Sequence, residues 1–146
     1  MKPTIRRRLA DVAACGLWLL TLTQAQAQAP AKAPPACPSP PEAGAPLSAG
    51  PVHLAWRTEP AALAVGQPFV LIVSLCPADA RLTRVDATMP EHRHGMNYRP
   101  TIQALGPGRW RAEGLLWHMS GRWELRLDVT AADGGAHTAR QSVPLP

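Results

Sequence analysis

Residues 122–129 alternate strictly between charged and apolar side chains, and this alternation restricts the fold more than any other feature of the chain. Successive side chains of a β-strand point to opposite faces, so the segment predicts a strand with one face in a core and the other in water. No segment carries the 3.6-residue apolar stripe of a helix. The apolar residues are Trp123, Leu125, Leu127 and Val129, and the charged ones are Arg122, Glu124, Arg126 and Asp128.

A second strand is predicted at residues 69–75, a nearly continuous apolar run bounded by Pro68 and Pro77. Such a run is typical of a central strand with both faces covered. Turn residues, most of them glycine, separate further candidate strands. Seven short strands at this spacing predict an all-β fold, an immunoglobulin-like antiparallel β-sandwich of about seven strands, with Trp56 or Trp123 in its core. The further strands are expected at residues 52–57, 81–88, 98–105, 109–116 and 136–143.

The first 29 residues have the three parts of a secretory signal peptide. Lys2 and the arginines at 6–8 come first, an apolar stretch follows, and small residues around Ala27 offer a cleavage site. Asp11 breaks the apolar stretch, which is shorter than the ~20 residues needed to cross a membrane. We therefore expect residues 1–29 to be removed and the mature protein to be periplasmic or secreted, without a transmembrane span.

Removal of this leader changes the charge of the chain. The full chain carries +5, but the leader holds four of its 15 basic and one of its 10 acidic residues, which leaves the mature part at +2. No basic stripe is interleaved with aromatics, so nucleic acid is not an expected partner. Residues 30–51 hold eight of the 17 prolines and predict an extended linker, and residues 52–146 predict one folded domain.

Cys37 and Cys76 are the two cysteines that remain after the leader is removed. An even pair in an exported chain is more often a disulfide than two free thiols. We predict a bridge that ties the proline-rich segment to the domain. A pair of copper-binding thiolates is the alternative, and it is less expected in an oxidising compartment.

Methionine and histidine gather in two short segments of the mature chain, residues 89–96 and residues 118–119. Thioether and imidazole groups together are the ligands that copper ions favour. The first segment, if extended, directs alternate side chains to one side. The second would reach the same end of the sandwich if the strands that precede the two segments run in compatible directions. The predicted ligand set is Met89, His92, His94, Met96, His118 and Met119.

The same residues also have a structural interpretation. Met89 and Met119 fall at strand ends, where methionine commonly fills gaps in a core, and a His-x-His segment in a loop is often only solvated. Arg93 and Arg99 lie close to the proposed site and would repel a cation unless they point outward. The residues alone leave both interpretations open.

The residue order from Val85 onward resembles the YtkA-like family of exported bacterial domains, which is itself similar to the FixH-like proteins. The resemblance covers about half the mature chain and implies a β-sandwich. It also implies copper handling or an oxidase-associated role, to which the family has mainly been linked. The chain departs from the FixH-like pattern because it has no retained membrane helix. The matching segments are residues 85–96 with their Met-Pro and His-x-His-Gly steps, the Gly-Pro-Gly turn at 106–108 before Trp110, and Met119-Ser120-Gly121-Arg122-Trp123.

Two functions of different kinds follow from these features. The first is a periplasmic copper-binding or copper-delivery domain whose partner is a periplasmic or membrane-bound redox protein. The second is a metal-free domain that docks on an envelope protein during assembly of a membrane or redox complex, through exposed Trp, His and Arg residues near the same segment.

Enzymatic activity is not expected. The serines lack a nucleophile-elbow context, and no carboxylate pair is placed near the histidines for acid–base chemistry. A hydrolytic zinc site made of Glu91, His92 and His94 would leave the methionines without a role.

Overall fold

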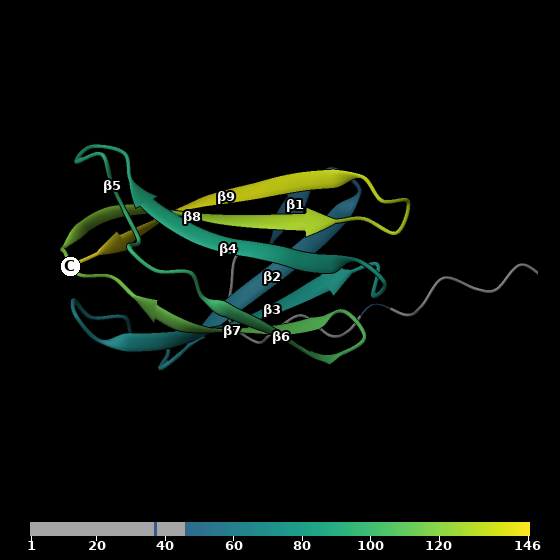
Figure 1. The fold of residues 1–146 in the computed structure, drawn as a ribbon, viewed down its shortest axis with the longest axis horizontal. Coiled ribbons are helices and arrows are strands. Elements are labelled where there is room, and N and C mark those ends of the chain that lie inside the picture. Colours follow the sequence, from purple (N-terminus) through teal and green to yellow (C-terminus); the bar gives the residue numbers. More distant parts are fainter. Residues whose placement is uncertain (1–36, 38–45) are drawn as a thin grey trace, which may run out of the picture. The chain divides into compact units, whose positions relative to one another are not determined.

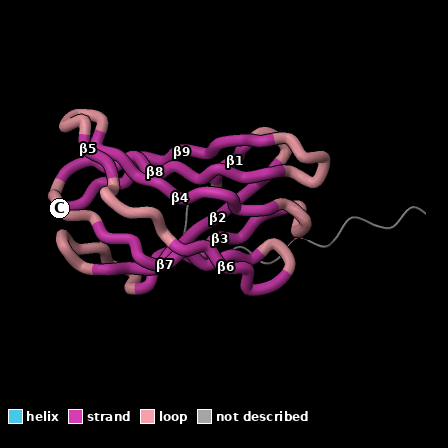
Figure 2. Tube along the Cα trace, viewed as in Figure 1, coloured by secondary structure: helices cyan, strands magenta, loops and turns pink. Residues whose placement is uncertain are grey.

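The computed structural model describes Cys37 and residues 46–146, and within these residues it contains nine β-strands and no helix (Figures 1 and 2). The predicted signal peptide and all of the predicted linker up to residue 45 except Cys37 lie outside the described residues. The described part contains no helix long and apolar enough to cross a membrane. The strands are β1 (Leu47–Ala49), β2 (Val52–Glu59), β3 (Pro68–Cys76), β4 (Arg81–Met89), β5 (His94–Gly95), β6 (Thr101–Gly106), β7 (Arg109–Leu116), β8 (Gly121–Thr130) and β9 (Ala136–Leu145).

The strands form two sheets that pack face to face, as predicted for a β-sandwich (Figure 1). One sheet has the order β1-β2-β3-β7-β6 and the other the order β5-β4-β8-β9. Every pairing is antiparallel. Seven of the nine strands are six residues or longer, and they match the seven predicted segments.

The first strand of the described residues is β1, and it lies inside the segment 30–51 that we predicted to be an extended linker. β1 pairs with the start of β2, with Leu47 opposite Leu54. Leu47 packs against the core and Ala49 is buried in it. The end of the proline-rich segment is therefore held by the same burial of apolar side chains that holds the longer strands.

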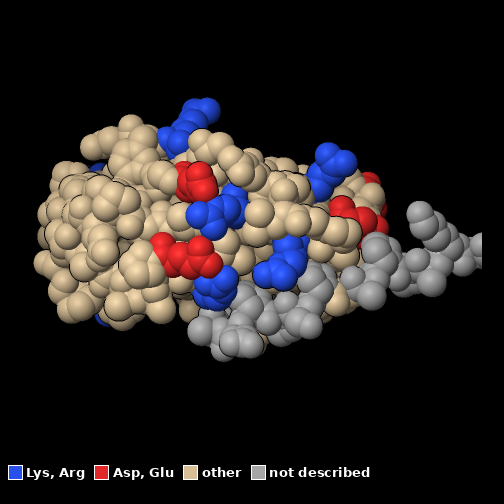
Figure 3. All heavy atoms as spheres, turned by 90° about the horizontal axis from the view of Figure 1, so that it is seen from below, with Lys and Arg blue, Asp and Glu red and all other residues tan. Residues whose placement is uncertain are grey.

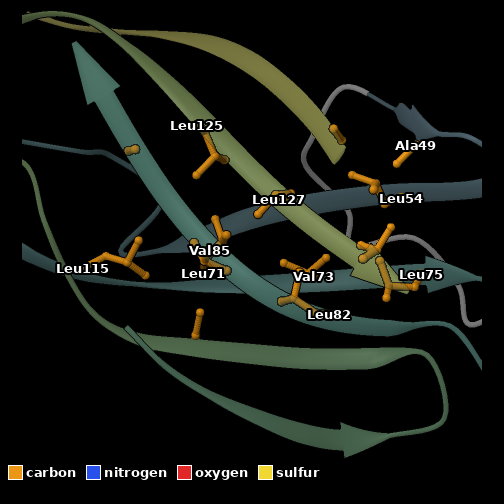
Figure 4. Packing of buried hydrophobic residues seen from close by; sticks show 14 of the residues in the cluster. Ala49, Leu54, Leu71, Val73, Leu75, Leu82, Val85, Leu115, Leu125 and Leu127 are labelled. Atoms are coloured by element: carbon orange, nitrogen blue, oxygen red, sulfur yellow. The ribbon is translucent and has the colours of Figure 1, made fainter. Parts of the chain in front are cut away.

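The core lies between the two sheets and follows the period-two pattern. The four predicted inward residues of β8 are at most 1% exposed, which confirms their predicted direction. β3 lies between β2 and β7, and residues 71–75 are all buried. Figure 4 shows side chains from β8, such as Leu125 and Leu127, facing those of β3, such as Leu71 and Val73.

The outward-facing residues pair with each other across the sheet surfaces. On β8, Arg126 lies 2.9 Å from Asp128, and Glu124 pairs with Arg140 of β9. On the other sheet Arg111 of β7 bonds Glu59 of β2 at 3.2 Å. In the face seen in Figure 3, the charged groups lie over the middle and the right end of the domain and leave its left end largely uncharged. Exposed pairs of this kind contribute roughly 0–1 kcal/mol each.

Cys37 lies beside Cys76 at the end of β3, with Cα atoms 5.0 Å apart. This separation is within the range of disulfides, roughly 4.4–6.8 Å. The predicted pair is therefore at disulfide distance, and it holds residue 37 against the end of a central strand.

Candidate metal-binding site

The two Met/His segments meet at one end of the sandwich. β4 and β7 both run towards this end, which lies at the left in Figure 1. β5 folds back on the end of β4, where His94 pairs with Met89, and the start of β8 lies on the other side of β4, where Glu124 pairs with Thr88. The condition that the preceding strands run in compatible directions is therefore met.

A tight turn presents the first two histidines. β4 ends at Met89, immediately before Pro90, and the backbone N–H of His92 donates to the carbonyl of Met89 at 3.2 Å. Arg93 adopts a φ of 54°, in the left-handed region that closes the turn. We had expected an extended segment, but it is not extended throughout. His92 lies in the turn, and only His94 and Gly95 form a strand.

Three imidazole rings form a row at this end. The ring centroids of His92 and His94 are 6.4 Å apart with planes 19° apart, and those of His94 and His118 are also 6.4 Å apart, with planes at 79°. All three side chains are exposed. We call His92, His94 and His118 the imidazole row.

The spacing of the imidazole row can be compared with the demands of a metal ion. Metal–nitrogen distances of about 2 Å place the centroids of two rings on one ion about 5–6 Å apart. Neighbouring rings of the row would need to approach by on the order of 1 Å, which exposed side chains reach by rotamer changes. The centroid separations in the row are therefore close to those of two rings bound to one ion.

The row does not form a complete site from one chain. Within residues 46–146 and Cys37, no three or more His, Cys, Asp or Glu side chains are placed so that they hold a metal ion. Any ion bound by two neighbouring imidazoles needs further ligands from thioethers, water or another molecule.

The three methionines differ in accessibility. Met89 is 0% exposed, and a methyl group added at Gly121 would lie 2.7 Å from its Cε atom. Met96 and Met119 are half-buried and pack against the edge of the core. Met89 thus has the packing role that we considered as the alternative, whereas Met96 and Met119 lie at the boundary between core and solvent.

An aromatic stack anchors His118. The ring of His118 lies 5.5 Å from that of Trp123 at 78°, and Trp123 stacks on Trp117 at 5.3 Å with planes 5° apart. Phe69 meets Trp117 edge-on at 5.2 Å. The indole N–H of Trp123 donates to the carbonyl of Met119 at 3.0 Å. The position of His118 is therefore coupled to the core through Trp123.

Trp117 is a component of this end that the sequence analysis missed. It is 1% exposed. Trp117 lies two residues after the buried Leu115, just beyond the end of β7, and this period-two spacing could have predicted that Trp117 points inward. All the tryptophans in the described part are buried or half-buried. The docking hypothesis named exposed Trp, His and Arg residues, and it is corrected for tryptophan only.

The cysteine pair lies away from the imidazole row. β3 starts beside the end of β7, where Pro68 pairs with Leu116, and it runs to Cys76 at the opposite end of the sheet. The cysteines therefore do not contribute to the site formed by the histidines.

No protein-family model matches the chain, and neither a curated protein nor a solved structure does. The resemblance to the YtkA-like family stays a prediction from the sequence.

Proposed function

We propose that this domain binds copper at the imidazole row, with Met96 and Met119 as additional ligands, and passes the ion to a partner protein. The observation that carries the proposal is the spacing of the row. Two segments far apart in sequence place three exposed imidazoles within 6.4 Å of their neighbours.

The types of ligand support copper over harder ions. Imidazole suits divalent copper, and thioether sulfur suits the softer monovalent ion. Met96 and Met119 lie at the same end as the row and are only half-buried. In this proposal Met89 supports the site from within the core and does not bind the ion directly.

The open geometry supports transfer over storage. Two neighbouring imidazoles leave coordination positions free on any ion they hold, and all three rings are exposed. A partner can therefore add its own ligands before those of the domain leave. We propose a carrier of metal without enzymatic activity.

The proposed location is an exported compartment, the periplasm or the outside of the cell. The cysteine pair at disulfide distance supports this location, because disulfides persist mainly in oxidising compartments. We propose a periplasmic or membrane-bound redox protein as the receiver of the copper.

Copper titration of the processed domain tests the proposal. His92→Ala combined with His94→Ala should weaken Cu(II) binding at least tenfold, and His118→Ala should weaken it as well. His53→Ala combined with His137→Ala is the matched control, because neither residue belongs to the row.

Competition with a chromogenic chelator measures Cu(I). Met96→Leu with Met119→Leu keeps the side-chain volume nearly unchanged and should weaken Cu(I) more than Cu(II). Equal copper affinity in the parent, the row variants and the His53/His137 control would refute the proposal and favour the metal-free docking domain.

A further inference from the structure

A hollow of about 370 Å³ lies beside β4, next to the candidate metal site. One wall is formed by residues 83–86 of β4, and the other by the segment that connects β5 with β6. Met96 belongs to this second wall and is two residues from His94 of the imidazole row. The hollow and the candidate metal site are therefore contiguous.

The hollow exists because β4 is an edge strand over most of its length. β5 pairs only with Thr88 and Met89, and the N–H of Met96 donates to the carbonyl of Ala87 at 3.1 Å. Residues 81–86 of β4 therefore have no paired strand on that side. The chain then crosses to the other sheet, and the hydroxyl of Tyr98 donates to the carbonyl of Leu116 in β7. This bond holds the crossing segment away from the edge of β4.

The edge of β4 is not suited to pairing with a further strand. The register shifts between Leu82 and Arg84, and a bulge of this kind interrupts the regular row of backbone groups. A ligand of the hollow is therefore expected to bind through its side chains.

The positive side chains that line the hollow outnumber the negative ones. Arg84 pairs with Asp86, whereas no carboxylate of the described residues lies within salt-bridge distance of Arg99. The walls leave one positive charge uncompensated, beside apolar groups such as Ile102. Tyr98, which also lines the hollow, is 38% exposed. Tyrosine and arginine are, with tryptophan, enriched among the residues that contribute most to the binding energy of protein interfaces.

We propose that this hollow docks an acidic, partly apolar peptide segment of the protein that receives the metal, with a carboxylate of that segment on Arg99. Charge complementarity identifies the occupant as acidic, and the apolar wall accepts a neighbouring aliphatic side chain. The identification of the partner as the metal receiver rests on the proposed function. The peptide site itself does not need copper.

Fluorescence anisotropy with a labelled peptide of alternating Glu and Leu residues tests the proposal on the processed domain without metal. The same peptide with Gln in place of Glu is the control ligand. Arg99→Gln should weaken binding of the acidic peptide at least tenfold. Arg109→Gln, an exposed arginine of β7 outside the hollow, is the matched control because it changes the net charge equally.

Three results would overturn the docking site. Equal weakening by both arginine variants would show unspecific electrostatic attraction. Equal binding of the Gln peptide would show that the carboxylates play no part. Binding of phosphatidylglycerol vesicles that depends on Arg99, without peptide binding, would show a site for lipid headgroups instead.

A separate variant distinguishes this proposal from the copper proposal. His92→Ala with His94→Ala removes two rings of the row, and neither residue lines the hollow. Its binding of the acidic peptide should equal that of the parent. A loss of peptide binding in this variant would contradict a docking site that works without the metal site.

Discussion

Replacement of Met89 with alanine tests whether its thioether packs the core or binds copper. The side chain is 0% exposed and lies within the core cluster. Truncation of a buried methionine removes its contacts and leaves a cavity, which costs about 2–5 kcal/mol. In a domain of this size such a loss lowers the melting temperature by about 8 °C or more. Met89→Leu, which conserves volume, should cost less than about 1.5 kcal/mol.

Gly121 lies beside the end of the Met89 side chain and provides a second variant that tests how this side chain packs. A methyl group there would press on the Cε atom of Met89 at 2.7 Å, and the φ of 125° is unfavourable for any other residue. Gly121→Ala should therefore be destabilising. In the Met89→Ala background the contact disappears and only the backbone strain remains. The two changes should thus cost less together than the sum of their separate costs, by about 0.5–3 kcal/mol.

Urea denaturation of the copper-free variants measures these free energies, and Cu(I) competition is measured in parallel. A cost of Met89→Ala below about 0.5 kcal/mol, as at surface positions, combined with weaker Cu(I) binding, would refute the packing role and make Met89 a ligand. Additive costs for Met89→Ala and Gly121→Ala would refute the contact between them.

Three further predictions concern the sandwich itself. Leu125→Ala should cost about 2–5 kcal/mol in urea denaturation because the side chain is 1% exposed, and a cost near zero would contradict the register of β8. Cys37→Ser with Cys76→Ser should cost about 3–4 kcal/mol, since the bridge would close a loop spanning 39 positions, and complete alkylation of the unreduced, denatured parent would show that no bridge exists. Burial opposes ionisation of Asp128, but hydrogen bonds from Arg126 and Thr138 outweigh it and hold its pKa below the ordinary value. The resulting stabilisation is present above the unfolded-state pKa of about 4 and is lost as the pH falls through the lower folded-state pKa, so acid titration of stability should be shallower in Asp128→Asn than in the parent.

The sandwich could be predicted because its long strands carry their orientation in their own residues. On β8, four apolar side chains in phase leave only one face that can enter a core, and a shift by one residue would bury Glu124 and Arg126 instead. On β3, the run from Leu71 to Leu75 is apolar except for Ser74, and it lies centrally between β2 and β7.

The two shortest strands could not be predicted in the same way. β1 has three residues and β5 has two, too few for a periodic pattern. They are strands only because they meet a partner: β1 pairs along the start of β2, and β5 pairs with Thr88 and Met89. Such pairing depends on the folded chain, so no local sequence pattern predicts it.

The residues of the candidate site also differ in whether a local sequence pattern predicts their position. The phase of β4 places Met89 inward with Val85 and Ala87, which are 3% and 0% exposed, so the packing role of Met89 was contained in the alternation of its own strand. The approach of His118 to His94 could not be predicted in this way. His118 follows the end of β7, and its position depends on its contact with Trp123 of β8. A variant that loosens this packing should therefore displace His118 as well as destabilise the core. The site and the core are for this reason expected to respond together to changes at Trp123, and separately to changes at His92, which lies in an exposed turn.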